Sequence, residues 1–461
     1  MNKTVTLRSE RLTYEPLNMK HLSEKYVNWM NDKDVNIYMS SGGDYTLEKL
    51  RLFLLDQQKK KILFWAIIKT NTKEHIGNIK IDPIDEKRKS GEYGIMIGNK
   101  LEWGKGYAKE ASKTIIKYCF EEIGLNEITL GVNKSNINAI KLYDRLGFIK
   151  FNRKISPDKY YNIKDEIIRM SKNKNIDKII LGTAQFGMDY GINNLNGKIN
   201  QEEIYKILEY SYDNGIRNID TAEIYGNSIE TIGEFHKQFP QKKFKVFSKV
   251  NYGNNNTCFS SNIITNLKKL GVDNYEGYMI HNYQLFKSDQ RLVTAMLDAK
   301  KSGIILKNGI SLYSNFEVYD IIDENTFDFI QLPFNLLDNS KKRESVIKSA
   351  KSKDIETYVR SIFLQGLFFK SQSSIPYNLK PLKKYIKKLI KIGLDINIDI
   401  NELALKYSLS KSYIDKIIFG IDNLSQLEKN IDIIKNEVQI PSVKIDKINV
   451  LENELLNPTN W

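Results

Sequence analysis

The spacing of apolar positions along the chain differs between the first 172 residues and the rest. An alternating segment at Thr4–Tyr14 precedes helical spacing at Met19–Met30 and Thr46–Lys61. Three strand-like runs come next, at Leu63–Ile68, His75–Asp82 and Gly91–Gly98. The pattern predicts helices followed by a group of strands.

Helices and strands alternate through the remainder of this region. The spacing predicts an amphipathic helix that ends near Phe120, a strand at Glu127–Val132, a helix that contains Tyr143 and a last strand near Glu166–Met170. A short polar join follows at residues 173–177. We therefore expect one domain at residues 1–172 and a second at residues 178–461. The join is too short to let the two domains move far from each other.

From Lys178 onward, apolar strand-like runs alternate with helical stretches, which favours βαβ units and a parallel sheet. The predicted strands are Lys178–Gly182, Ile216–Asp220, Lys245–Lys249, Gly277–His281, Ile304–Ile310, Phe327–Gln331, Glu356–Arg360 and Asp415–Gly420. Eight βα units in about 260 residues match the α/β class of TIM (β/α)₈ barrels, in which reactive groups lie at the C-terminal strand ends.

Composition narrows the class of protein. Of the 461 residues, 41% are apolar, as in ordinary soluble globular proteins. The formal net charge is +14, but basic and acidic residues are interleaved, so we expect no nucleic-acid partner. A positive field would still attract anionic small molecules such as nucleotides.

Cysteine content and hydropathy bear on location. The only cysteines are Cys119 and Cys258, too few for a disulfide framework or a zinc site, so we expect a reducing compartment and no metal. The N-terminus lacks the apolar core of a signal peptide, and no apolar run approaches a membrane span of about 20 residues. We expect a cytoplasmic protein with small-molecule substrates and no membrane insertion, and an oligomer is possible.

One basic stretch has two interpretations. Lys380–Lys391 places Leu382, Ile386 and Leu389 at helical spacing, with lysines on the opposite side. This arrangement is typical of the solvated outer helix of a barrel, and also of a helix that lies on a membrane surface.

The segment Trp103-Gly-Lys-Gly-Tyr-Ala108 joins a predicted strand to a predicted helix. A glycine-rich turn that opens a helix can bind an anion, because free amide groups and the helix dipole point at it. Asn136-Ile-Asn-Ala-Ile-Lys-Leu-Tyr143 and Leu146-Gly-Phe148 follow the next strand. With these motifs, residues 5–171 resemble the GNAT acetyltransferase superfamily, in the branch of the ribosomal-protein and amino-sugar enzymes.

The resemblance implies a GNAT α+β fold with a mixed central sheet and acetyl-CoA as the donor. Tyr143 matches the phenol that protonates the departing thiolate, and Glu92 is the candidate base for the attacking amine, through a water molecule. Trp103 stands where many relatives have Gln or Arg. The residues expected to bind the cofactor are Trp103, Gly104, Lys105, Gly106, Ala108 and Asn136.

Four polar residues fall at or just beyond the ends of three successive barrel strands: Asp220, Tyr225, Lys249 and His281. A phenol, with a pKa of about 10, is a weak acid at neutral pH unless a cation lowers that pKa, and we expect Lys249 to do so. Asp220 would hold Lys249, and His281 would bind the phenol or a carbonyl oxygen. Because no side chain donates hydride, such a site requires a nicotinamide cofactor.

Residues 178 to about 437 resemble the aldo-keto reductase superfamily, most closely the branch encoded with surface-polysaccharide genes. The resemblance rests on Leu181-Gly-Thr-Ala-Gln-Phe-Gly187, on Asp220-Thr-Ala222 with Tyr225-Gly226, and on the tail Gly420–Asn430. It implies NADPH or NADH as cofactor, with Asn430 near the adenine. The residues expected to bind it are Ser311, Gln331, Arg360, Ser361, Phe363, Gly366, Gly420, Asn423, Gln426 and Asn430.

Three positions depart from the family pattern. Leu312 stands where the pattern has Asn. Arg360 replaces the aromatic residue that stacks on the nicotinamide, so its guanidinium would stack there or meet an acidic substrate group. Gln426 stands where NADP-dependent relatives have Arg for the 2′-phosphate, which leaves the choice between NADP and NAD open.

Together the two sites predict a bifunctional enzyme. One domain would be an N-acetyltransferase of an amino sugar or nucleotide-linked amino sugar, and the other a carbonyl reductase or alcohol dehydrogenase in the same surface-glycan pathway. Two alternatives stay open. In the first, the acetyl group goes to a protein N-terminus or a small amine. In the second, one domain has lost its catalytic activity and serves as a binding scaffold.

Overall fold

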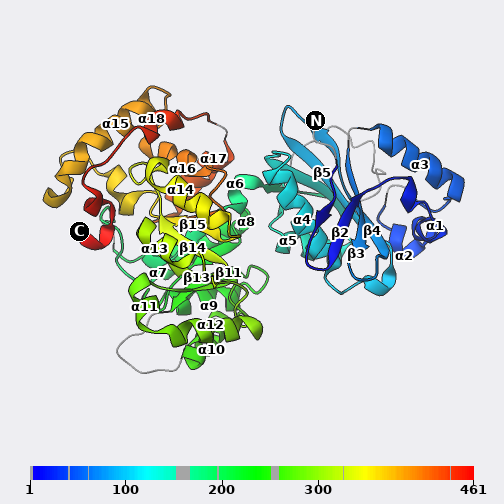
Figure 1. Cartoon of the computed structure of the whole chain (residues 1–461), viewed down its shortest axis with the longest axis horizontal. Coiled ribbons are helices and arrows are strands. Elements are labelled where there is room, and N and C mark those ends of the chain that lie inside the picture. Colours follow the sequence, from blue (N-terminus) through cyan, green and yellow to red (C-terminus); the bar gives the residue numbers. More distant parts are fainter. Residues whose placement is uncertain are drawn as a thin grey trace. The chain divides into compact units, whose positions relative to one another are not determined.

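The computed structural model describes residues 4–39, 42–60, 62–151, 167–194, 197–250, 259–324, 326–436 and 438–461. The chain divides into two compact units, Met1–Lys174 and Asn175–Trp461 (Figure 1). The border lies inside the predicted join at residues 173–177, where the end of strand β8 is followed directly by the short helix α6 (Lys174–Asp177).

The first unit contains a mixed sheet with the strand order β1-β2-β3-β4-β5-β6-β8-β7 in the described residues. Its strands are β1 (Leu7–Arg8), β2 (Leu12–Pro16), β3 (Leu63–Lys69), β4 (His75–Asp85), β5 (Ser90–Ile97), β6 (Glu127–Asn133), β7 (Ile149–Lys150) and β8 (Ile167–Asn173). Its main helices are α1 (Glu24–Asn31), α2 (Lys33–Asn36), α3 (Leu47–Lys59), α4 (Tyr107–Glu121) and α5 (Ile137–Arg145). The predicted strands are confirmed, with Glu166 lying outside the described residues.

Helices cover both faces of this sheet. Along β3, Trp65 and Ile67 belong to the apolar cluster that contains residues of α4 and α5, whereas Ala66 and Ile68 belong to the cluster of α1 and α3. This alternation follows from the period of two in a strand. It explains why β3 reads as an almost continuous apolar run rather than as an alternating one.

Strands β5 and β6 run parallel but stay paired over a short length only. The register joins Ser90 to Glu127 and Glu92 to Thr129, and no further pair between these strands occurs among the described residues. Both strands continue beyond that point, β5 to Ile97 and β6 to Asn133. Their facing backbone groups are therefore open to a ligand between them.

The second unit is a closed barrel of eight parallel strands in the described residues, as predicted. The strands are β9 (Ile179–Gly182), β10 (Asn218–Asp220), β11 (Lys245–Val250), β12 (Gly277–Ile280), β13 (Asn308–Ser311), β14 (Phe329–Pro333), β15 (Glu356–Arg360) and β16 (Lys416–Phe419). The prediction placed the start of β13 too early. Ile304 and Ile305 lie between the preceding helix and β13: their amides donate to the Ala299 carbonyl, and their side chains pack against the core.

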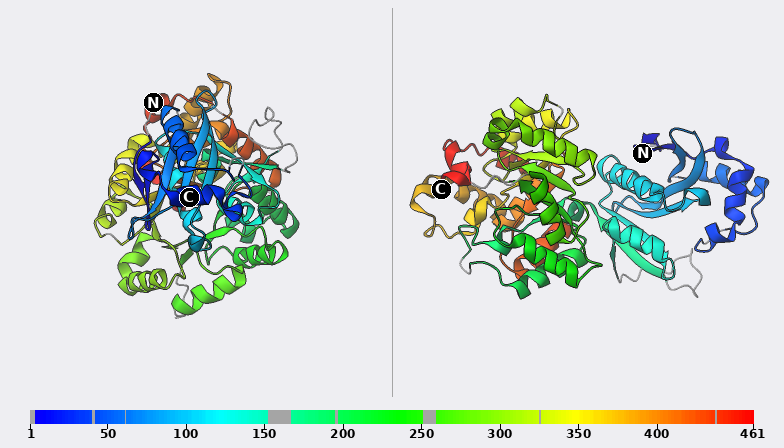
Figure 2. Two further views of the ribbon diagram at one scale, coloured as in Figure 1. Left: turned by 90° about the vertical axis from the view of Figure 1, so that its right-hand side faces the viewer. Right: turned by 90° about the horizontal axis from the view of Figure 1, so that it is seen from below.

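Helices surround the barrel strands, as Figure 2 shows from two directions. They are α7 (Ala184–Gly187), α8 (Gln201–Asp213), α9 (Ser228–Gln238), α10 (Phe259–Leu270), α11 (Tyr283–Ser288), α12 (Gln290–Lys301), α13 (Asn315–Ile321), α14 (Ser340–Lys351), α15 (Lys383–Leu394), α16 (Ile400–Leu409), α17 (Leu424–Lys435) and α18 (Ser442–Asp446). Inside the barrel, a separate cluster of buried side chains fills the axis, with Phe329 and Tyr358 stacked 4.6 Å apart. The barrel is a packed core rather than a pore.

The lysine-rich stretch at Lys380–Lys391 belongs mostly to α15. Leu382, Ile386 and Leu389 are buried in the main core of the barrel unit. This packing matches the outer-helix interpretation. In the described ranges no helix combines the length and apolar character needed to cross a membrane.

Candidate active sites in the two units

The four predicted polar residues of the barrel come from three neighbouring strands. Asp220 ends β10, Lys249 lies near the end of β11, and His281 directly follows β12. Tyr225 lies in the turn between β10 and α9. Because parallel strands of a barrel end at the same rim, these side chains face one region, as the sequence predicted.

Asp220 is the centre of a buried polar network. Its carboxylate forms an ion pair with the Lys249 ammonium, and its second oxygen accepts a hydrogen bond of 2.9 Å from the Gln331 amide. Lys249 also donates to the Thr221 carbonyl at 3.2 Å. Both charged side chains are at most 5% exposed. Gln331 was predicted to bind the cofactor, and in the structure its amide nitrogen fixes Asp220.

Tyr225 is held by close contact between two turns. A side chain at Gly187 would come within 1.7 Å of the Tyr225 carbonyl oxygen, and Gly226 adopts a φ of 53°. The Lys249 ammonium lies 5.2 Å from the centre of the Tyr225 ring. Glycine at both positions therefore lets α7 lie directly against the turn that carries the phenol.

The expectation that Lys249 lowers the pKa of Tyr225 is wrong for the protein as described. Burial and the Asp220 carboxylate raise the pKa of the phenol above its usual value, and Arg360 is the cation that opposes them. The pKa of Lys249 is itself lowered, because burial outweighs the attraction of Asp220. A phenol of ordinary pKa is already protonated at neutral pH, and these contributions keep Tyr225 in that form, from which it can donate a proton.

His281 is neutral over the physiological range. Burial, together with the charges of Lys249 and Arg360, lowers its pKa to about 3. A neutral imidazole can both donate and accept a hydrogen bond. It can therefore orient a carbonyl oxygen next to the phenol without adding another positive charge.

This pKa predicts how His281 affects stability. The folded pKa of about 3 lies below the unfolded value of about 6.5, so the unfolded chain takes up the proton first as pH falls. Stability should decline below about pH 6.5, and His281→Gln should reduce the loss between pH 7 and pH 5 by about 2 kcal/mol. Urea unfolding at both pH values measures this. An identical loss in the variant would show that His281 titrates normally in the fold.

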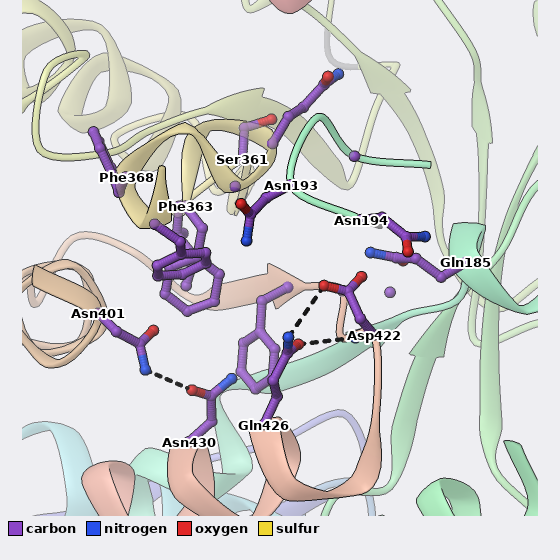
Figure 3. Close-up of a pocket in the computed structure, with 18 of the residues that line it drawn as sticks. Gln185, Asn193, Asn194, Ser361, Phe363, Phe368, Asn401, Asp422, Gln426 and Asn430 are labelled. Carbon is purple, nitrogen blue, oxygen red and sulfur yellow. Dashed lines mark hydrogen bonds between the residues drawn. The ribbon is translucent and has the colours of Figure 1, made fainter. Parts of the chain in front are cut away.

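A cavity of about 740 Å³ opens beside these residues. Asp220, Tyr225 and Gln331 line it from the region of the strand ends, and Asn401 and Asn430 line it from helices α16 and α17. Predicted cofactor residues in its wall are Gln331, Arg360, Ser361, Phe363, Gly366, Gly420, Gln426 and Asn430. Lys249, His281, Ser311 and Asn423 do not belong to the lining that the described residues form. Figure 3 shows part of the lining, with Gln185, Ser361, Asp422, Gln426 and Asn430 among the labelled residues.

The chemistry of the lining fits a nicotinamide dinucleotide. A side chain at Gly420 would come within 2.5 Å of the Gln185 amide oxygen, so the glycine lets the end of the Gln185 side chain lie directly against the backbone of the cavity wall. On α16, Asn401 donates to Asn430 at 3.1 Å, while its own buried amide oxygen has no partner in the described part of the chain. A donor such as an adenine amino group would satisfy that oxygen. Asn401 was not predicted from the sequence.

Two predicted residues have structural partners. Asn423 caps α17: its side-chain oxygen accepts a hydrogen bond of 2.9 Å from the backbone amide of Gln426. Arg360 packs over the ring of Tyr313 at 4.2 Å and has no carboxylate partner among the described side chains. Ser311 is buried at the end of β13. Arg360 therefore stays available to an anionic or planar ligand group.

In the first unit, the predicted phosphate loop has the geometry of an anion site. Gly104 and Gly106 have φ values of 78° and 83°, which favour glycine. Gly106 begins α4 without any side-chain cap, so the first amide groups of the helix are free to bind an anion. The Lys105 ammonium pairs with Glu102 at 3.0 Å, and Trp103 is 46% exposed. This loop fits the pyrophosphate of acetyl-CoA.

Three further predicted residues surround the point where β5 and β6 separate. Tyr143 packs on Tyr93, with ring centres 5.9 Å apart, so Glu92, the neighbour of Tyr93, faces the opposite side of the sheet. Glu92 forms a bidentate ion pair with Arg169, with one contact of 2.7 Å. This pair competes with the expected role of Glu92 as a base. Asn136 caps α5 through a 3.2 Å hydrogen bond from the Ala139 amide.

No group of three His, Cys, Asp or Glu side chains that could hold a metal ion occurs in the described ranges. Cys119 is a buried free thiol. The other cysteine, Cys258, lies outside the described residues.

Comparison with known proteins agrees with this geometry. Residues 178–452 match the model of the aldo/keto reductase family, and residues 11–149 match that of the GNAT acetyltransferase domain. A protein of Bacillus licheniformis called uncharacterized N-acetyltransferase p20 is 30% identical over 152 residues, which are 32% of this chain and 83% of that protein. Spermidine N(1)-acetyltransferase of Vibrio cholerae is 26% identical over 24% of this chain, and the match spans 65% of its length.

A solved aldo-keto reductase of Bacillus halodurans, in its holo form, is similar to the second unit. It shares 18% identity, covers 60% of this chain and 94% of its own, and has a TM-score of 0.49.

Proposed function

The chain belongs to the aldo/keto reductase family and carries a GNAT acetyltransferase domain, and from this premise we propose that it is a cytoplasmic bifunctional enzyme of sugar metabolism. Its cofactors are acetyl-CoA and NAD(P)H. One site would acetylate the amino group of an amino sugar or nucleotide-linked amino sugar. The other would reduce a carbonyl group, or form one in reverse, in the same surface-glycan pathway.

The observation that carries the reductase assignment is the buried network around Asp220 next to the Tyr225 phenol. Gln331 and Lys249 hold the carboxylate from two sides, so the Lys249 side-chain nitrogen is fixed 5.2 Å from the centre of the phenol ring. Tyr225 would give its proton to a carbonyl oxygen, and neutral His281 would orient that oxygen. A bound nicotinamide would supply the hydride.

For the acetyltransferase, we assign separate roles to Tyr143 and Glu92, which lie on opposite faces of the sheet. The open start of α4 would hold the pyrophosphate, and Tyr143 would protonate the leaving thiolate. Glu92 would accept a proton from the attacking amine through water, once its pairing with Arg169 loosens. A ligand between β5 and β6 would meet both side chains, because they lie on opposite faces at that gap.

The sugar substrate is supported by two indirect arguments. The short join keeps both sites in one chain, which is useful when two steps modify one molecule. The barrel sequence also resembles the branch encoded with surface-polysaccharide genes. Supplying acetyl-CoA with candidate amino sugars, peptides and small amines, and following free thiol, tests the proposal. Acetylation of peptides alone would exclude it.

A small amine is the acceptor named by one relative, the spermidine enzyme. Spermidine therefore belongs in the same panel as the amino sugars. If it is acetylated and no sugar is, the two domains act in unrelated reactions. The third possibility, a retired domain that serves as a scaffold, would leave one of the two cofactors unbound in a fluorescence titration.

Tyr143→Phe should slow acetyl transfer by about 10²-fold, because the leaving thiolate loses its proton donor. Reduction by the barrel should be unchanged. Release of free thiol measures the first activity, and loss of NADH or NADPH absorbance measures the second. Tyr118→Phe is a matched control, because this phenol packs on Trp65 in the same unit. Loss of both activities in Tyr143→Phe would indicate misfolding instead of a catalytic role.

A further inference from the structure

The two ends of the barrel cavity must take the two halves of a nicotinamide dinucleotide. Asp220 and Tyr225 are the lining residues to which proton transfer is assigned, so the reacting ring belongs beside them. The adenosine half then occupies the end near Asn401 and Asn430 (Figure 3). This step rests on the proposed reductase function.

The two carboxylates Asp399 and Asp422 of the cavity wall differ in their partners. Asp399, Asp422 and Lys429 all line the cavity. Lys429 is already paired with Asp399 at 2.5 Å. The Asp422 carboxylate accepts a hydrogen bond of 3.1 Å from the Gln426 side-chain amide and has no cationic partner among the described residues. Of these two carboxylates, Asp422 is therefore the one without an ion pair.

Gln426 is committed to Asp422 at both ends of its amide. Its nitrogen donates to the Asp422 carboxylate, and its oxygen accepts from the Asp422 backbone amide at 2.9 Å (Figure 3). The side chain is thereby turned toward the carboxylate. One of the two N–H donors of the amide is used in this contact.

We infer that Asp422 makes the barrel select NADH over NADPH. The two cofactors differ at the adenosine ribose, where NADH has a hydroxyl group and NADPH a phosphate. A hydroxyl can donate a hydrogen bond to the Asp422 carboxylate. A phosphate monoester carries a charge of about −1.5 to −2 at neutral pH and would meet a carboxylate instead of a cation.

Binding measurements on the full chain test this inference without relying on turnover. The Kd of NADH and of NADPH can be obtained by titrating each against protein fluorescence. We expect wild type to bind NADH at least about tenfold more tightly, and Asp422→Asn to narrow that ratio several-fold through tighter NADPH binding. Gln426→Arg, which adds a cation at the same place, should narrow it further.

A matched control removes the same charge elsewhere. Asp323→Asn changes a carboxylate that is 75% exposed and pairs with Lys353, and it should leave the ratio of the two Kd values as in wild type. Equal or tighter binding of NADPH by wild type would overturn the inference, as would an unchanged ratio in both Asp422→Asn and Gln426→Arg. Failure of wild type to bind either cofactor would instead overturn the proposed reductase function, and this inference with it.

Discussion

Replacing Tyr225 by phenylalanine should lower the rate of carbonyl reduction by about 10³-fold, because the substrate oxygen loses its proton donor. The phenol is protonated at neutral pH, as any phenol of ordinary pKa is, and burial and Asp220 raise its pKa further. The ring is kept in the variant, so the Kd of the nicotinamide cofactor should be nearly unchanged. Steady-state reduction and a fluorescence titration measure the two quantities separately.

A control for this experiment removes a phenol outside the cavity. Tyr205→Phe deletes a hydroxyl on α8 that accepts a hydrogen bond of 3.0 Å from Gln201 at the surface. This variant should reduce carbonyl substrates at the wild-type rate. Unchanged turnover in Tyr225→Phe would reject the assigned proton donor. Weaker cofactor binding in that variant would point to a role in binding instead.

Breaking the buried Asp220–Lys249 pair should have the largest effect on stability. Lys249→Met leaves the Asp220 carboxylate buried with only the Gln331 amide, and Asp220→Asn leaves the ammonium unpaired. Each should cost about 3–5 kcal/mol in the free energy of unfolding of the barrel. The double variant should recover most of this loss, because it contains neither buried charge, but it should remain inactive in reduction.

Urea unfolding of the wild type, the two single variants and the double variant completes this cycle. An exposed pair gives the comparison: Glu202→Gln breaks the ion pair with Lys206, at 2.7 Å on α8, and should cost far less than either buried variant. The account would be contradicted if the double variant were no more stable to unfolding than the less stable of the two single variants. It would mean that packing, and not the unpaired charge, causes the loss.

Much of the fold could be predicted because the barrel strands are buried on both sides. Runs such as Ile179–Gly182 are continuously apolar, and polar residues of the site lie at the ends of strands such as β10 and β12. The prediction failed where an apolar pair had another cause. Ile304 and Ile305 lie just beyond the end of helix α12 and pack against the core, and a sequence pattern cannot separate that from the start of a strand.

The sequence predicted many residues of the site and the pairing of Asp220 with Lys249, but it could not predict most other contacts between them. Gln331 and Asp220 are 111 positions apart, so their hydrogen bond depends on the closed barrel. The pairing of Glu92 with Arg169 likewise depends on the register of β5, β6 and β8. Asp422 could have been found earlier, because it lies inside the Gly420–Asn430 motif and its charge is unusual beside a phosphate-bearing ligand.

The most direct test of the central claim follows both reactions in one preparation. Wild type, Tyr143→Phe and Tyr225→Phe are given acetyl-CoA, NADH or NADPH, and a panel of amino and keto sugars free or linked to nucleotides. We predict that wild type gives both the thiol and the absorbance signal, and that each variant loses one and keeps the other. Loss of both signals in a folded single variant, or neither signal from wild type with any sugar, would contradict the account.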